Sequence, residues 1–403
     1  MNTTPAPTPA PRIAIIGAGP GGLTCARILQ EHGVTATVYD ADASRTARDQ
    51  GGTLDMHPGS GQHALKEAGL LDEFLAEARP EGQQMRLVGR DGRILFDAVP
   101  PPADTAPPTS DTAPPTSEAT EGNPEIDRGQ LRDLLLDSLK PDTVRWDHKL
   151  TRVAPLEDGT HRLHFADGTT ADADLVIGAD GAWSRVRRLL SDAEPVYTGV
   201  TFVETGFNDA DRHHPVLAEL TGDGTMMALD DNRGFVAQRN SGGHIRVYVG
   251  LRTDENWHQQ AGVDLTDTDT AAVREALLDE FAGWSPELLG FITGTDTGYT
   301  NRPLYALPVP HTWPHTPGLT LLGDAAHLMS PFSGMGANLA MLDGADLARA
   351  LVDNPTIDQA ITAYEETLLP RSIEAAEGAA EGINSAFAPD SATQTLAHMT
   401  QHH

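Results

Sequence analysis

Cysteine is almost absent from this sequence, and positive charge is scarce. Cys25 is the only cysteine among 403 residues, so neither a disulfide framework nor a Cys-x-x-Cys pair can form, which predicts a reducing, cytoplasmic setting. Lys and Arg total 28 against 58 Asp and Glu, a formal net charge of −30. Because this excess repels phosphate groups, nucleic acids and anionic membranes are expected to be poor partners.

Several catalytic and membrane signatures are also missing. No apolar run approaches the roughly 18 residues of a membrane span. Residues 1–11 lack the basic residues and apolar core of a signal peptide. No Gly-x-Ser-x-Gly elbow occurs, which removes the commonest hydrolase signature. The pairs His213-His214 and His402-His403 lack metal-ligand spacing, so we expect no metal site.

A glycine loop near the start of the chain predicts a dinucleotide site. Residues 12–16 form a short apolar run, followed by Gly17, Gly19 and Gly22 in a Gly-x-Gly-x-x-Gly pattern and by a helical stretch, 23–30. Such glycines let the backbone approach a pyrophosphate, which then lies at the positive end of the helix. We expect these three glycines to bind the cofactor.

An acidic residue follows this loop at the distance typical of dinucleotide sites. A second strand is predicted over 34–39 and delivers Asp40, eighteen residues after Gly22. A carboxylate there would accept hydrogen bonds from the adenosine ribose and repel a 2′-phosphate. The resident nucleotide is therefore predicted to be FAD or NAD rather than NADP.

A second motif lies before the middle of the chain. A buried parallel strand over 173–178 leads to Asp180-Gly181, and a helix is predicted to start at Ser184, a good N-cap residue. Because Asp-Gly suits many turns, this segment is either a part of the cofactor site or an ordinary connection between a strand and a helix.

The third motif, near the end of the chain, follows a short apolar strand. That strand delivers Asp324, whose carboxylate can accept hydrogen bonds from ribityl hydroxyls. Pro331, Gly334 and Gly336 then bring backbone to the start of a long helix that also carries Asn338. Amides at that helix start would stabilise the negative charge of a reduced flavin at its N1 and C2 edge. Together the three motifs predict an FAD site closed from three sides.

Strand patterns dominate residues 197–252. The last of these strands alternates polar and apolar residues, as a sheet with one wet face should. The predicted strands of this sheet are 85–88, 93–96, 198–203, 216–220, 225–229, 234–238 and 244–251. We expect an antiparallel sheet over the cofactor that forms the roof of the substrate site, with helices over 271–292 and 357–387.

The order of these motifs resembles that of the single-component, class A flavoprotein monooxygenases, and within them the tetracycline-inactivating flavin monooxygenases. The likeness covers nearly the whole chain, and its motifs are most specific in the FAD-binding half. The segments that carry the closer match are Gly51–His57, Gly59–Gln62, Ala68–Leu71, Pro124–Arg128, Leu131-Arg132, Trp146-Asp147 and Gly323–Met329.

The resemblance implies an α/β fold, in which a Rossmann-like FAD-binding domain of GR2/PHBH type is interleaved with an antiparallel β-sheet substrate domain. A C-terminal helix bridges the two. The predicted FAD-binding domain comprises 12–84, 124–192 and 296–350, the substrate domain 85–99 and 193–295, and the bridging helix 355–390. Residues 1–11 and the Pro/Thr-rich loop 100–123, which contains a repeated heptad, are expected to be disordered.

The resemblance also implies FAD as resident cofactor and NADPH as a transient reductant. It places Asp324 and Arg128 at the ribityl and pyrophosphate region, Asp55 close to the flavin, and Arg48 in contact with NADPH. Each of the last three has a simpler reading: Arg128 as a surface charge at a helix start, Asp55 as a cap, and Arg48 as a solvated loop residue. Because the flavin C4a-hydroperoxide of this family is itself the electrophile, no catalytic side chain is predicted.

Departures from the family pattern fall where substrate would lie. By the resemblance, Glu204, Thr225 and Arg246 occupy positions of a tetracycline-contacting Gln, Arg and His. Glu204 and Arg246 could instead form a plain cross-strand ion pair. Phe332 would supply an apolar wall for an aromatic ring, and the resemblance suggests Phe387 as a further pocket residue.

The sequence thus predicts a monomeric, FAD- and NADPH-dependent monooxygenase that uses O2 to hydroxylate tetracycline or a related polycyclic phenol. Two alternatives stay open: an FAD monooxygenase for another aromatic or polyketide metabolite, and a non-catalytic flavoprotein that sequesters a ligand. A flavin halogenase is disfavoured because no two of the five tryptophans lie two residues apart.

Overall fold

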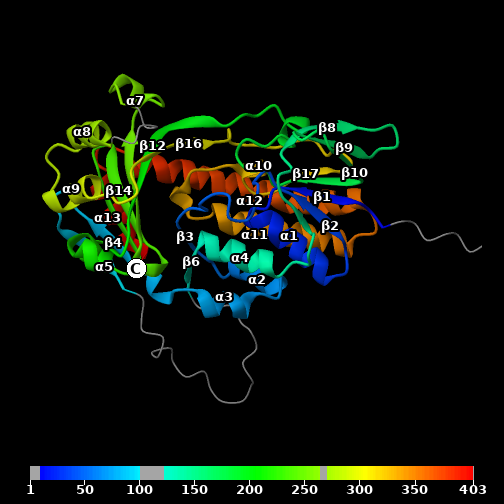
Figure 1. Ribbon diagram of the computed structural model, residues 1–403, viewed down its shortest axis with the longest axis horizontal. Helices are drawn as coiled ribbons and strands as arrows, with labels where there is room; N and C mark the ends of the chain where they lie inside the picture. Colours follow the sequence, from blue (N-terminus) through cyan, green and yellow to red (C-terminus); the bar gives the residue numbers. More distant parts are fainter. Residues whose placement is uncertain (1–9, 100–121, 264–269, 403) are drawn as a thin grey trace, which may run out of the picture.

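The computed structural model describes residues 10–99, 122–263 and 270–402, and its two halves are built on different sheets (Figure 1). One half contains a parallel sheet and the other a larger, mostly antiparallel sheet. Helix α12 (Ile357–Ala386) extends along both halves, at almost the predicted bounds. The predicted α/β fold is confirmed. Disorder is predicted for 1–11 and 100–123, and of these residues 1–9 and 100–121 lie outside the described ranges.

The parallel sheet has the strand order β17-β11-β1-β2-β7. Its strands are β1 (Ile13–Ile16), β2 (Ala36–Tyr39), β7 (Val144–Arg145), β11 (Leu175–Gly178) and β17 (Leu319–Leu321). The four apolar side chains of β1 are all buried, as expected for a parallel sheet covered on both faces. Ile16 pairs with Gly178, which pairs with Leu321, so the carboxyl ends of β1, β11 and β17 meet at one edge.

Helices α1 (Pro20–Glu31) and α11 (Gly336–Asp353) pack closely through glycine. A β-carbon on Gly21 would lie 2.4 Å from the carbonyl oxygen of Ala340, and one on Gly344 would lie 2.4 Å from the carbonyl oxygen of Gly21. Only glycine permits this approach. The neighbouring helices are α2 (Gly61–Glu67), α3 (Leu71–Glu77) and α4 (Arg128–Asp137).

Two smaller sheets complete this half. The first is antiparallel and consists of β8 (Leu150–Pro155), β9 (His161–Phe165) and β10 (Thr170–Ala173). The second is a ribbon of β3 (Thr53–Asp55) and β6 (Glu125–Asp127). This ribbon ties the segment after β2 to the start of α4.

The larger sheet has the order β16-β12-β15-β14-β13-β4-β5, and only β13 and β4 pair in parallel. Its strands are β4 (Met85–Val88), β5 (Ile94–Ala98), β12 (Val196–Phe207), β13 (Thr225–Asp230), β14 (Arg233–Arg239), β15 (Ile245–Arg252) and β16 (Thr300–Ala306). The predicted substrate domain ends at 295, whereas β16 of this sheet begins only at Thr300. The domain boundaries stay a prediction.

Helices cover one face of this sheet, in the left part of Figure 1. That face buries Val203, Phe235 and Val247 against apolar residues of α8 and α9. The remaining helices and 3-10 turns are α5 (Ala210–His213), α6 (Pro215–Thr221), α7 (Trp257–Gln260), α8 (Ala271–Glu280), α9 (Pro286–Thr293), α10 (Asp324–His327), α13 (Ser391–His402), η1 (Pro80–Gln83), η3 (Arg187–Leu189), η4 (Ser241–Gly243) and η5 (Pro331–Ser333).

The predicted strand 216–220 is wrong, because these residues belong to helix α6. Pro215 occupies the first turn, where its missing N–H costs nothing. Leu217, Ala218 and Thr221 are buried at helical spacing, and the Thr221 hydroxyl donates to the carbonyl oxygen of Leu217 at 2.8 Å. The apolar run alone could not distinguish a helix from a strand.

Two helix predictions also need correction. The predicted helix 271–292 is interrupted, because Ser285 caps a new helix by accepting the Leu288 N–H at 3.3 Å, and Pro286 opens its first turn. After Ser184 only the three-residue turn η3 forms. The Ser184 hydroxyl still accepts the Arg187 N–H at 2.9 Å, so its capping geometry is present without a full helix.

Candidate functional site

The glycine loop contains two glycines that the protein's own packing requires and one that it does not. Gly17 has a φ of +113°, and a β-carbon there would lie 2.2 Å from the carbonyl oxygen of Ala179. A β-carbon on Gly22 would lie 2.3 Å from the carbonyl oxygen of Gly17. Gly19 has an ordinary φ of −79° and no atom within 4 Å of a β-carbon position. Open space at the start of α1 suits an anion such as a pyrophosphate.

Asp40 follows β2 and directs its carboxylate at this loop. Oδ2 accepts the Ala18 N–H at 2.6 Å, and Oδ1 accepts the Asp42 N–H at 2.8 Å. The carboxylate therefore fixes the loop, and each oxygen keeps a further lone pair for a ribose hydroxyl. The ribose contact itself stays a prediction.

Arg132 supports the loop from α4, a role that the sequence patterns did not reveal. Its side chain is 3% exposed and donates to the carbonyl oxygens of Ala18 at 3.1 Å and Arg45 at 3.0 Å. A third nitrogen lies 3.3 Å from Asp42 Oδ2, and burial lowers the pKa of the guanidinium. The sequence feature that could have revealed this role is a single arginine on the otherwise apolar face of a helix.

The Asp-Gly turn after β11 is held by its own aspartate. The Asp180 carboxylate accepts the Ser184 hydroxyl at 2.5 Å and the Arg185 N–H at 2.7 Å, and burial raises its pKa. Gly181 has a φ of +75° and no atom within 4 Å of a β-carbon position. The Asp180 side chain thus serves the connection itself, while the Gly181 backbone stays open to a ligand.

The Gly-Asp motif lies beside that turn. Asp324 is the first residue of α10 and is exposed, and Gly323 before it has a φ of +59°. The buried Arg187 joins the two loops, because it donates to the carbonyl oxygens of Ala182 at 2.6 Å and Ala325 at 3.1 Å. The structure therefore brings the three predicted motifs to one edge of the parallel sheet.

Asn338 clamps the start of α11 to the segment after β3. Its Oδ1 accepts the N–H groups of His57 at 2.9 Å and Gly61 at 3.1 Å. Its Nδ2 donates to the carbonyl oxygen of Asp55 at 2.7 Å, and the residue is 1% exposed. With these partners the side chain positions the loop, and any cofactor contact must come from the nearby backbone.

Asp55 lies at the end of β3, facing the turn before α11. Its Oδ2 is 2.8 Å from His57 Nε2, and a β-carbon on Gly334 would lie 3.8 Å from the same oxygen. Gly334 has a φ of +67° and follows Pro331 in the turn that leads to Gly336. The predicted flavin-side residues Asp55, Pro331, Gly334 and Gly336 are therefore neighbours.

The two predicted cofactor arginines differ in their surroundings. Arg128 opens α4, donates its N–H to the carbonyl oxygen of Gly52 at 3.0 Å, and forms no ion pair with any residue that the structure describes. An unpaired guanidinium in so acidic a chain is suited to a phosphate. Arg48 is 60% exposed and lies 3.1 Å from Asp42 Oδ2, which supports its simpler reading as a loop residue.

The three predicted substrate positions lie on one face of the seven-stranded sheet. Arg246 is directly opposite Gln238, which is opposite Thr225, and Glu204 is opposite Tyr248 in the adjacent row. Residues directly opposite one another point to the same face. Gln238 and Tyr248 share this face, although the sequence patterns did not single them out.

Charged groups gather on this face. Glu204 accepts hydrogen bonds from Arg246 and, at 3.0 Å, from Arg302 Nε on β16. The predicted alternative of a cross-strand ion pair is therefore confirmed, with a diagonal geometry because Arg246 is opposite Gly206.

Residues 49–52, which we call the strap, touch the same face from the other half. Asp49 Oδ2 lies 2.5 Å from Arg246 Nη2. A β-carbon on Gly52 would lie 2.9 Å from Gln238 Oε1 and 3.1 Å from the Tyr248 hydroxyl. The strap thus connects the sheet face to the segment that leads to Asp55.

Aromatic side chains border the charged groups. Phe332 and Phe387 lie 5.5 Å apart with perpendicular rings, and Phe202 lies 5.3 Å from Tyr248. Phe387 is 1% exposed, and a β-carbon on Gly250 would lie 2.5 Å from its ring. The Phe387 ring therefore packs directly on Gly250 of the sheet. Contact of Phe332 or Phe387 with a substrate stays a prediction.

A buried charge network lies behind the Gly-Asp motif. Asp343 is fully buried and accepts the Gly323 N–H at 3.0 Å, His327 Nε2 at 2.6 Å and Arg371 Nη2 at 3.0 Å. Burial opposes ionisation of both members of the His327–Asp343 pair. Their mutual attraction outweighs it, so the pKa of His327 is raised and that of Asp343 is lowered.

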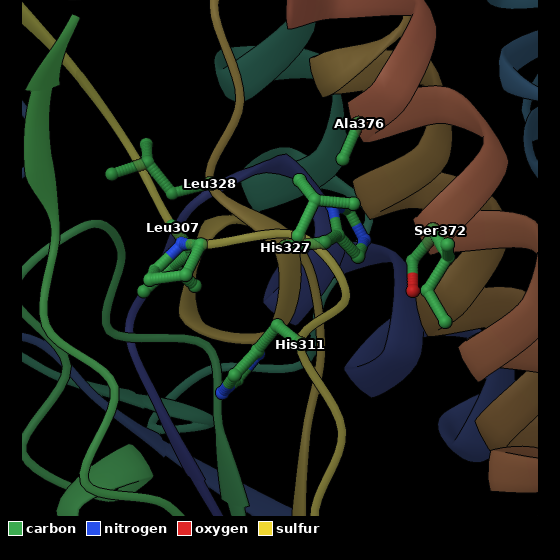
Figure 2. Close-up of a pocket in the computed structure, with 9 residues that line it drawn as sticks. Leu307, His311, His327, Leu328, Ser372 and Ala376 are labelled. Atoms are coloured by element: carbon green, nitrogen blue, oxygen red, sulfur yellow. The ribbon is translucent and has the colours of Figure 1, made fainter.

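A cavity of about 10 Å³ lies on the other side of His327 (Figure 2). It is lined by Leu307, Pro308, Val309, His311, His327, Leu328, Ser372, Ile373 and Ala376. His311 Nε2 and His327 Nδ1 are buried and have no hydrogen-bond partner within the described residues. The volume suits one water molecule and excludes an aromatic substrate.

The His327–Asp343 pair predicts a stability that falls on both sides of an acidic optimum. The Asp343 contribution is present above its ordinary pKa of 3.8 and is lost as pH falls below that value. The His327 contribution is complete below its ordinary pKa of 6.5 and is lost as pH rises through its raised pKa. Thermal unfolding of the wild type and of His327→Asn should be measured across this pH range. We expect the difference between their two melting temperatures to become smaller above pH 6.5; a difference that grows there would contradict the assignment.

Metal and membrane signatures are also absent from the described structure. No group of three or more His, Cys, Asp or Glu that could hold a metal occurs within 10–99, 122–263 and 270–397. The side chains of His402 and His403 lie outside these ranges. No helix in the same part of the chain has the length and apolar character required to cross a membrane.

Comparison with known proteins assigns the chain to a family. A family model described as an FAD binding domain matches residues 11–377. This chain belongs to that family of FAD-dependent monooxygenases. The predicted class A flavin monooxygenase identity and the resident FAD are thereby confirmed.

Relatives of this FAD-dependent monooxygenase match over most of their length. Monooxygenase penA of Penicillium thymicola is 31% identical, over 90% of this chain and 92% of the relative. The 3-amino-4-hydroxybenzoate 2-monooxygenase PtnB3 of Streptomyces platensis is 32% identical, over 96% of this chain and 92% of the relative.

Solved structures share the fold at lower identity. An HpxO variant of Klebsiella pneumoniae complexed with FAD has a TM-score of 0.78 and 22% identity, covering 98% of this chain and 95% of the other. The tetracycline destructase Tet(55) has a TM-score of 0.71 and 21% identity, covering 97% and 94%. The likeness to tetracycline destructases is therefore one of fold, and the relatives named above are other monooxygenases.

Proposed function

We propose that this monooxygenase takes electrons from NADPH and hydroxylates an aromatic or polycyclic phenolic compound, with tetracycline as one candidate. The observation that carries the proposal is the contact between the strap and the polar sheet face, since it brings Glu204, Arg246 and Tyr248 next to the segment that leads to Asp55. A relative named for 3-amino-4-hydroxybenzoate supports an aromatic substrate. Because a single cysteine cannot form a disulfide within the chain, the composition supports action in the reducing cytoplasm. We also expect the protein to be a monomer.

The residues present fit FAD. Gly19 and Gly336, at the starts of α1 and α11, each have no atom within 4 Å of a β-carbon position, so neither glycine is explained by protein packing. We assign the pyrophosphate to the start of α1, the ribityl chain and the flavin edge to the Gly-Asp motif and the start of α11, and the adenosine side to β2. The cofactor-binding residues in this assignment are Gly17, Gly19, Gly22, Asp40, Arg128, Asp180, Gly181, Asp324, Pro331, Gly334, Gly336 and Asn338, with Asp55 beside the flavin.

Bound FAD would accept hydride from NADPH and activate O2 for transfer of one oxygen atom to substrate. The start of α11 would stabilise negative charge on the reduced cofactor. Arg246 and Glu204 would orient polar groups of the substrate, with Thr225 in the same face. Phe332 and Phe387 would exclude water from the aromatic ring of the substrate. Arg48 is the proposed NADPH contact.

Asp324→Ala should lose FAD without losing its fold. The side chain is exposed, so its removal leaves no cavity, whereas hydrogen bonds to a charged acceptor contribute about 1.5–3 kcal/mol each. We expect FAD to bind about tenfold to hundredfold more weakly, measured as the ratio of flavin to protein absorbance after purification. Asp353→Ala, at the far end of α11, is the matched control. An Asp324→Ala protein with stoichiometric FAD would remove this residue from the site.

The proposed activity is tested by following NADPH oxidation by the purified yellow protein with and without tetracycline or 3-amino-4-hydroxybenzoate. Ligand-stimulated oxidation, with a product one oxygen atom heavier, is the expected result. NADH in place of NADPH tests the choice of reductant. A ligand that binds without stimulating oxidation would favour a sequestering flavoprotein instead.

A further inference from the structure

Arg246 is a largely buried cation of the polar sheet face, and its guanidinium is incompletely bonded. Its side chain is 11% exposed. One terminal nitrogen donates to Glu204 and the other to Asp49. Its Nε is buried and has no hydrogen-bond partner among the described residues. A buried guanidinium with a free donor is suited to a further acceptor oxygen.

The two carboxylates on Arg246 are not equally held. Glu204 is 16% exposed, lies within β12, and also bonds Arg302, so its position is fixed from two sides. Asp49 is 68% exposed and belongs to an irregular segment between β2 and β3. Because Asp49 itself is exposed to water, its pairing with Arg246 contributes less stability than the more buried pairing of Glu204. Of the two, Asp49 is therefore the carboxylate that a ligand can replace.

The local charges also favour an anionic replacement. Within the ion-paired cluster alone, Arg246 and Arg302 carry two positive charges, and Glu204 and Asp49 carry two negative charges. Departure of Asp49 leaves one positive charge next to the Tyr248 hydroxyl and Gln238. An incoming anionic oxygen restores neutrality and finds the donors of Arg246 already oriented.

We propose that Asp49 occupies the place of an anionic oxygen of the substrate, and that substrate binding displaces the strap from Arg246. Asp49 is then a specificity-determining residue, and the preferred substrate is an aromatic compound with a carboxylate. The inference rests on the proposed function, because it names the substrate class of the same site.

The test is equilibrium binding to the oxidised holoenzyme, followed by the change in flavin absorbance without NADPH. The probes are 3-amino-4-hydroxybenzoate and its uncharged methyl ester. Asp49→Asn removes the competing charge, so the acid should bind roughly threefold to tenfold more tightly, whereas the ester should bind as it does to the wild type. Glu280→Gln is the matched control, because it breaks an exposed carboxylate–arginine pair with Arg233 on the same sheet.

A failure of this binding test can be distinguished from a failure of the proposed function, because binding is measured without catalytic turnover. The inference would be overturned if Asp49→Asn bound the acid no more tightly than the wild type does. It would also be overturned if the substitution tightened binding of the ester as much as binding of the acid, or if neither protein bound the acid. Unchanged flavin content and melting temperature show that the variant is folded. Hydroxylation of a substrate with no effect of Asp49→Asn would sink the inference and leave the monooxygenase standing.

Discussion

Gly17→Ala should yield a destabilised protein that purifies without FAD. The residue has a φ of +113°, and its β-carbon would lie 2.2 Å from the carbonyl oxygen of Ala179, so both the loop and the end of β11 must shift. Backbone strain and overpacking together predict a loss of roughly 2–6 kcal/mol in the free energy of unfolding. Denaturant unfolding and flavin absorbance measure the two effects.

Gly19→Ala is the informative control for that variant. Gly19 has no atom within 4 Å of a β-carbon position and a φ of −79°, so alanine fits the protein without strain. We expect near wild-type unfolding of the apoprotein together with weakened FAD binding, because only the cofactor would meet the new methyl group. Equal FAD content in Gly19→Ala and wild type would contradict a pyrophosphate at the start of α1.

Asp343→Ala should lose about 3–5 kcal/mol of stability, because it leaves the buried His327 and the partly buried Arg371 without their shared carboxylate. It also removes the acceptor of the Gly323 N–H, which fixes the turn before Asp324. FAD affinity should therefore fall along with stability. Chemical unfolding of apo and holo protein separates the two losses.

Asp346→Ala provides the comparison for Asp343. Asp346 bonds the other side of the Arg371 guanidinium at 2.7 Å but is 29% exposed, so its loss should cost no more than about 1 kcal/mol. Similar losses in the two variants would show that the buried network does not stabilise the motif as described.

The cofactor half followed from its sequence because each motif is short and local. Gly17, Asp180 and Asp324 all lie just beyond the ends of parallel strands, and parallel strands bring such residues to one edge. The order of three strand–turn–helix segments was sufficient to predict their meeting. The helix start at Ser184 failed because capping geometry does not itself determine how far a helix continues.

The substrate face was harder to predict because it depends on register between distant strands. Arg246, Gln238 and Thr225 form one row only because β15, β14 and β13 pair as they do. The strap contact joins Asp49 to Arg246 across 197 residues, and no local pattern encodes it. The roles of Arg132 and Asp343 were missed for the same reason, since their partners come from several elements.

Mass spectrometry of the product formed under isotope-labelled O2 tests the central claim most directly. The reduced holoenzyme is mixed with labelled O2 and an aromatic ligand that stimulates NADPH oxidation, and the ligand is recovered after a single turnover. A monooxygenase with this site should give a product that carries one labelled oxygen atom. Recovery of unmodified ligand, with all the labelled oxygen appearing as hydrogen peroxide, would contradict the account.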